Sequence, residues 1–116
     1  WDEALAAFNR SIEIKLAHNQ TAKDTAYTRT RKARVLMHMG KNEDARKELE
    51  LAIEEHASKK DPDQNSVGAT WFRLAKLEKA VGDRAAAKEA GLKAQAAYTT
   101  TKSKMASDVE AFLAEL

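Results

Sequence analysis

The chain has 116 residues, of which 33% are charged and 6% aromatic, and its formal net charge is +2. Because basic and acidic side chains nearly balance, the composition does not indicate nucleic-acid binding. The absence of cysteine excludes disulfides and thiolate chemistry. No apolar run is long enough to predict a membrane span or a signal-peptide core. We expect one domain, located in the cytoplasm.

The first predicted helix covers residues 1–18. Its apolar side chains recur at steps of three and four and therefore share one face: Trp1, Leu5, Phe8, Ile12 and Leu16. The sequence opens inside this pattern without a methionine, so we expect a fragment of a longer protein. A turn is predicted at residues 19–21, with His18 near the end of the helix.

Two further helices are predicted on either side of Gly40, over residues 23–39 and 42–57. Gly40 is expected to stop the first of them, and Asn42 is the expected N-cap of the second. The earlier helix carries four cations within six residues: Arg29, Arg31, Lys32 and Arg34.

The only polar loop of real length is predicted around Pro62, and Asp63 or Ser66 is expected to cap the helix that follows. That helix is placed at about 67–81 and the next at about 83–99, with Gly82 between them. Three consecutive threonines at 99–101 predict a bend. A last helix is expected over about 102–116, without the alanine pattern of the others.

Small residues recur along the chain at a fixed interval. Gly82, Ala87 and Ala94 follow 42 positions after Gly40, Ala45 and Ala52, and a weaker copy begins 41 positions earlier, at Ala4. Such self-similarity predicts an all-α array of about six helices. The alanines are expected where paired helices touch, since larger side chains there would force the helices apart.

These residues resemble those of tetratricopeptide repeats. Trp71, Leu74 and Ala75 are similar to the family's first-helix signature, Gly82 and Asp83 to its turn, and Ala87 and Ala94 to its second-helix alanines. The resemblance implies antiparallel helical hairpins stacked as a superhelix. It divides the chain into the second helix of a truncated repeat (1–18), two repeats (23–57 and 66–99) and a capping helix (102–116).

Three features depart from the family pattern. The interval of about 42 residues is longer than the usual 34 and resembles the kinesin-light-chain variety. Arg29 and Lys32 stand where tryptophan and leucine are expected, so the helix must shift or bury only their aliphatic stems. Gly91 replaces a bulky residue and leaves room for a neighbour such as Phe112.

Little in the sequence predicts catalysis, a metal or a cofactor, and we expect none. The three histidines, His18, His38 and His56, lack ligand spacing. The neighbouring carboxylates Glu48, Glu50, Glu54 and Glu55 are expected on exposed helix faces. No glycine-rich phosphate loop precedes a helix.

The resemblance implies that the first helix of each repeat lines a concave groove that binds a peptide or a partner protein. The implied groove positions are Tyr27, Thr30, Arg34, Met37, His38, Ala69, Phe72, Lys76 and Lys79. Cations beside aromatic rings favour an acidic peptide. The groove asparagines of the family's carboxylate clamp are absent, so that mode is not predicted.

Two other function classes stay open. The repeats could serve as an architectural or regulatory spacer of a larger protein, or self-associate as a dimer through the face that carries Trp1. Nucleic-acid binding through Arg29, Arg31, Lys32 and Arg34 is disfavoured, because these cations point around the helix and have few aromatic partners.

Overall fold

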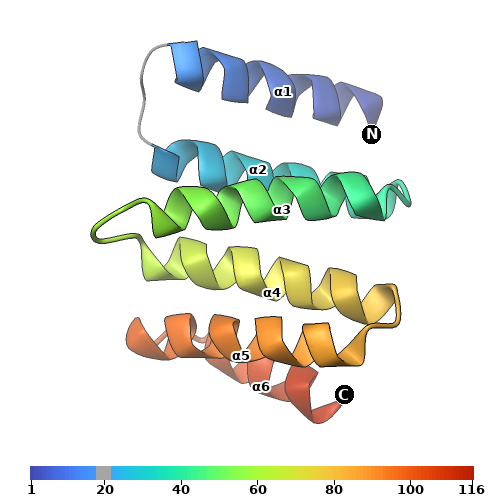
Figure 1. The fold of residues 1–116 in the computed structure, drawn as a ribbon, viewed down its shortest axis with the longest axis vertical. Helices are drawn as coiled ribbons and strands as arrows, with labels where there is room; N and C mark the ends of the chain where they lie inside the picture. The colour runs from blue at the N-terminus through green and yellow to red at the C-terminus, as the bar shows by residue number, and fades with distance from the viewer. Residues whose placement is uncertain (18–21) are drawn as a thin grey trace. The chain divides into compact units, whose positions relative to one another are not determined.

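The computed structural model describes residues 1–17 and 22–116, and these residues form six α-helices (Figure 1). The helices are α1 (Asp2–Ala17), α2 (Ala22–His38), α3 (Asn42–Ala57), α4 (Gln64–Ala80), α5 (Arg84–Thr100) and α6 (Met105–Ala114). The predicted all-α class is confirmed. The turn predicted at 19–21 and the role given to His18 fall outside the described residues.

The helices belong to two compact units, residues 1–62 and residues 63–116. In the first unit α1 packs on α2 and α2 on α3; in the second α4 packs on α5 and α5 on α6. Figure 1 shows that α2 and α3 run antiparallel, as do α4 and α5. Each unit is therefore built on one helical hairpin, with α1 or α6 packed beside it.

The two hairpins have matching boundaries. The bounds of α4 (Gln64–Ala80) lie 42 positions after those of α2 (Ala22–His38), and α5 begins 42 positions after α3. The turns match as well, because Gly40 and Gly82 have φ of 78° and 91°. The amide after each glycine donates to a carbonyl five residues back, Lys41 to Leu36 and Asp83 to Glu78. Glycine adopts this left-handed conformation without the strain a side chain brings.

The alanines expected between paired helices are fully buried. Ala45, Ala52, Ala87 and Ala94 each have 0% exposure, as predicted from their spacing. In the first unit Leu49, which lies between Ala45 and Ala52 on α3, is also fully buried. In the second, α6 completes the core, where Phe112 meets Phe72 edge to face with ring centroids 5.6 Å apart.

Glycine allows two close approaches in the second unit. A Cβ on Gly68 would lie 2.8–2.9 Å from ring atoms of Tyr98, so α4 can lie against that ring only because the position carries no side chain. A Cβ on Gly91 would meet Leu113 at 2.7 Å and Phe112 at 3.7 Å. The space at Gly91 is thus filled by α6, by Leu113 more closely than by the expected Phe112.

Several helix ends differ from the predictions. The N-cap of α3 is Lys41 rather than Asn42, and its side chain makes no capping hydrogen bond. α4 begins at Gln64, earlier than expected, because the Asp63 carboxylate accepts the amide hydrogen of Asn65. The predicted bend at 99–101 begins late: Thr99 and Thr100 stay in α5, where their hydroxyls donate to carbonyls four residues back.

The residues that the structure describes include no helix with the length and hydropathy needed to cross a membrane.

Candidate functional site

The four clustered cations of α2, within residues 29–34, separate into two pairs with different surroundings. Arg29 Nη1 lies 2.9 Å from Glu48 Oε2 and Arg29 Nε lies 3.1 Å from Glu55 Oε1, while Lys32 Nζ lies 2.8 Å from Glu48 Oε1. All four side chains are between 13% and 19% exposed. Arg29 and Lys32 therefore belong to an ionic cluster between α2 and α3, which we call the ionic tetrad.

The structure corrects the expectation that Glu48 and Glu55 lie on exposed faces; only their neighbours Glu50 and Glu54 do. Burial raises the pKa of Glu55 above 4.5, and it outweighs the hydrogen bond and charge of Arg29, which favour the ionised carboxylate. The ionic tetrad thus carries a desolvation cost that the ion pairs only partly offset.

The second unit has an apolar counterpart of the ionic tetrad. The positions 42 residues after Arg29, Lys32, Glu48 and Glu55 are Trp71, Leu74, Ala90 and Ala97. Trp71 and Leu74 pack against a core that includes Ala90, and Ala97 is 4% exposed. Arg29 and Lys32, which depart from the family pattern, are therefore paired with two carboxylates on α3. The bounds of α2 are not shifted relative to those of α4.

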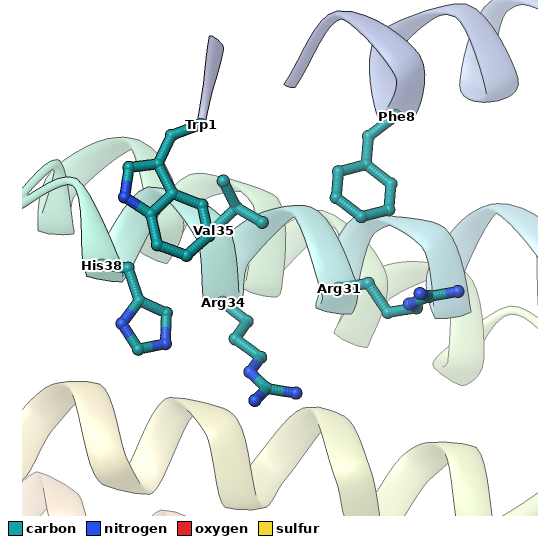
Figure 2. Close-up of a pocket in the computed structure, with 6 residues that line it drawn as sticks. All are labelled: Trp1, Phe8, Arg31, Arg34, Val35 and His38. Carbon is teal, nitrogen blue, oxygen red and sulfur yellow. The ribbon is translucent and has the colours of Figure 1, made fainter. Parts of the chain in front are cut away.

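The other two cations, Arg31 and Arg34, are exposed and line a cavity of about 220 Å³ between α1 and α2 (Figure 2). Trp1, Phe8, Val35 and His38 complete the lining. Figure 2 shows Trp1 and His38 at one end of the cavity, Phe8 and Arg31 at the other, and Arg34 projecting from α2 between them. We call this feature the arginine cavity.

Aromatic rings make contacts at both ends of the arginine cavity: ring stacking at one end and cation–π contacts at the other. The rings of Trp1 and His38 stack with centroids 5.3 Å apart and planes 4° from parallel. The Arg31 guanidinium carbon lies 5.7 Å from the centroid of Phe8 and 5.8 Å from that of Tyr27. Such cation–π contacts hold the charged group in place without neutralising it.

No carboxylate is among the described residues that line the arginine cavity. Among the side chains that the structure describes, those of residues 1–14 and 25–116, neither Arg31 nor Arg34 forms an ion pair. A second cavity of the first unit, of about 310 Å³, differs in this respect because Asp44 and Glu48 lie among its lysines. The arginine cavity thus presents two cations without a carboxylate among its described lining residues, which suits an anionic ligand.

The groove residues expected on α2 differ in exposure and location in the structure. Arg34 and His38 line the arginine cavity, Tyr27 is 53% exposed, and Met37 is half-buried. Thr30 is buried and its hydroxyl donates to the Ala26 carbonyl. Thr30 therefore offers almost no surface to a partner.

Two of the expected positions on α4, Phe72 and Lys79, contact α6 or the residue after it in the same unit. Phe72 is buried against Phe112, and Lys76 Nζ stands 4.3 Å above the Phe72 ring centroid. Lys79 Nζ stands 5.4 Å from the Phe112 centroid and 3.4 Å from Glu115 Oε2. Ala69 is half-buried. In this unit Lys79 therefore already has an aromatic and an acidic partner from the chain itself.

Sequence reasoning assigned Trp1 and Phe8 to the apolar face of the first helix and missed that they line a cavity with arginines. Their spacing did place them on one face, but the pattern does not tell where that face meets α2. Among the residues that the structure describes, no group of three or more histidines or carboxylates has metal-ligand geometry.

The chain matches no known family model, no curated protein and no solved structure.

Proposed function

We propose that this chain is a tetratricopeptide-type repeat fragment that acts as a protein-interaction module and binds an acidic segment of a partner. The shared boundaries of the two hairpins, their left-handed glycine turns and their buried alanines support the repeat assignment. In that family the first helix of a repeat lines the binding surface, and α2 has this position in the first unit.

The observation that carries the proposal is the arginine cavity. It presents Arg31 and Arg34 to solvent beside aromatic rings, with no carboxylate among its described lining residues. Arginine donates to carboxylates through two parallel N–H groups, which makes it the cation best suited to recognise acidic side chains. Of the four clustered cations of α2, the ionic tetrad takes Arg29 and Lys32 and leaves these two arginines to meet a partner.

The experiment is a fluorescence-anisotropy titration with labelled decaglutamate. We expect the double variant Arg31→Gln/Arg34→Gln to bind it at least about tenfold more weakly than the wild type, since two charge-assisted contacts are lost. The matched control, Arg10→Gln/Arg84→Gln, removes the same charge from exposed positions of α1 and α5. Equal loss in both double variants, or none in either, would contradict the proposal.

Self-association is a second candidate, favoured by the exposed side chain of Trp1, just before α1. Trp1 is 64% exposed. A dimer through the face that carries Trp1 should show a mass that rises with concentration in light scattering, and the Trp1→Ser variant should stay monomeric. A monomeric wild type across the whole concentration range would remove this candidate.

A further inference from the structure

The arginine cavity carries more positive charge than one carboxylate can neutralise. Arg31 and Arg34 both carry a full charge at neutral pH, and His38 adds ring N–H donor capacity at the same cavity. A single glutamate or aspartate brings one negative charge, so one cation of the pair would keep no counter-charge. A phosphomonoester brings a charge of about −1.5 to −2 and three acceptor oxygens.

The spacing of the two arginines also favours a phosphoryl group. Positions 31 and 34 lie one turn apart on α2, and residues three apart on a helix have Cβ atoms about 5–6 Å from each other. Two guanidinium groups at this separation can donate to different oxygens of one phosphoryl group. Contact with Phe8 and Tyr27 already orders Arg31, which lowers the entropy lost on binding.

We propose that the acidic segment is anchored in the arginine cavity by a phosphorylated side chain of the partner. The proposal rests on the proposed docking function and specifies its ligand. The cavity, about 220 Å³ and open to solvent, has room for the phosphoryl group and its linking atoms. The Trp1 ring, stacked on His38 at one end of the cavity, offers an apolar surface against which the flanking residues of the partner pack.

The test is an NMR titration of the ¹⁵N-labelled chain with three acetylated, amidated pentapeptides. Their central residue is phosphoserine, glutamate or serine between alanines. The indole N–H of Trp1 reports on the cavity, and that of Trp71 on the other unit serves as the internal reference. We expect the phosphoserine peptide to bind at least about tenfold more tightly than the glutamate peptide.

Single variants locate the effect. Arg34→Gln and Arg31→Gln should each reduce the affinity for the phosphoserine peptide to near that of the glutamate peptide, while Arg84→Gln, on exposed α5 surface, should leave it unchanged. Because both cavity arginines are exposed, these variants should keep the helical circular-dichroism signal of the wild type.

Two outcomes would overturn the phosphate anchor. If the glutamate and phosphoserine peptides bind equally, while decaglutamate binding still depends on the arginines, the docking function stands and only the anchor is wrong. Inorganic phosphate that binds as tightly as the phosphoserine peptide would show that no protein-borne side chain is recognised. If decaglutamate binding is also indifferent to Arg31 and Arg34, the docking proposal itself fails.

Discussion

At the scale of single residues, a comparison of the two units shows how the side-chain size at one buried position depends on the size at another. Gly68 and Tyr98 in the second unit stand 42 positions after Ala26 and His56 in the first, and all four are buried. In the second unit α5 carries the large ring of Tyr98, and the residue of α4 that lies against this ring is a glycine, which has no Cβ. The two units thus divide side-chain volume differently between these corresponding buried positions.

We predict that Gly68→Ala lowers the free energy of unfolding by about 1–2 kcal/mol, because the new Cβ meets a buried ring and this outweighs the better helix propensity of alanine. The cost should be smaller when the same change is made in a Tyr98→His background, which reproduces the first-unit pair. Urea unfolding of the four proteins measures the coupling. An identical cost in both backgrounds would contradict this account of the contact.

Glu55 gives a prediction about pH. Because burial raises its pKa above 4.5, the folded chain keeps a proton on Glu55 over a range where the unfolded chain has released it. Stability from this group is complete below 4.5 and is lost as the pH rises through the raised pKa. Relative to Glu55→Gln, the wild type should therefore become less stable in urea unfolding as the pH rises from below 4.5 through the raised pKa.

The control for this series is Glu50→Gln, at an exposed position of the same helix. The difference in unfolding free energy between this variant and the wild type should stay flat across the series. A wild type that gains stability over Glu55→Gln as the pH rises would show that Arg29, and not burial, governs the carboxylate.

At the scale of helices, the elements were largely predictable and their polar contacts were not. The 42-residue recurrence and the glycines locate both hairpins, because a left-handed turn and a close helix contact demand particular residue types. The ionic tetrad joins residues 16–26 positions apart. Which polar side chains face each other over such a separation in sequence depends on how the helices pack. The periodicity of the sequence does not predict it.

The same reasoning applies to the candidate site. Arg34 and His38 were predicted because the family resemblance assigns them to its binding groove. Arg31 entered as part of a basic cluster, Phe8 as part of the apolar face of the first helix, and Trp1 as part of that face and of the dimer face. The arginine cavity arises where α1 meets α2, and the sequence between these helices carries no repeat that fixes this contact.

The ionic tetrad leads to a prediction for two variants. Arg29→Met leaves Glu48 and Glu55 partly buried without their main partner and should lower the free energy of unfolding by about 2 kcal/mol. Replacing all four residues by their second-unit counterparts (Arg29→Trp, Lys32→Leu, Glu48→Ala and Glu55→Ala) should leave stability within about 1 kcal/mol of the wild type or above it. Thermal and urea unfolding measure both. If the fourfold variant is less stable than Arg29→Met, the ionic tetrad and its apolar counterpart are not interchangeable.

The buried alanines lead to a second prediction at this scale. Ala87 is fully buried between α5 and its neighbours, whereas Ala85 on the same helix is exposed. Ala87→Leu should cost about 1–3 kcal/mol by overpacking, while Ala85→Leu should change stability by less than about 0.5 kcal/mol. Equal melting temperatures for the two variants would contradict the proposed helix contact.

At the scale of the whole molecule, the net charge of +2 conceals how the charges are distributed. Two cations of α2 are matched by carboxylates of α3 in the ionic tetrad, and Lys79 is paired with Glu115 in the second unit. Arg31 and Arg34 are different, because no carboxylate is among the described residues that line their cavity. We propose that the two pairs of cations on this helix have different roles: one pair stabilises the packing of α2 on α3, and the other binds a partner.

The most direct test compares decaglutamate binding by two variants that each remove two cations of α2. The fourfold tetrad replacement also removes two carboxylates and so keeps the formal charge of the chain. We predict that it binds within about twofold of the wild type, whereas Arg31→Gln/Arg34→Gln binds at least about tenfold more weakly. A tetrad replacement that stays folded yet loses as much affinity as the arginine variant would contradict the division between the two pairs.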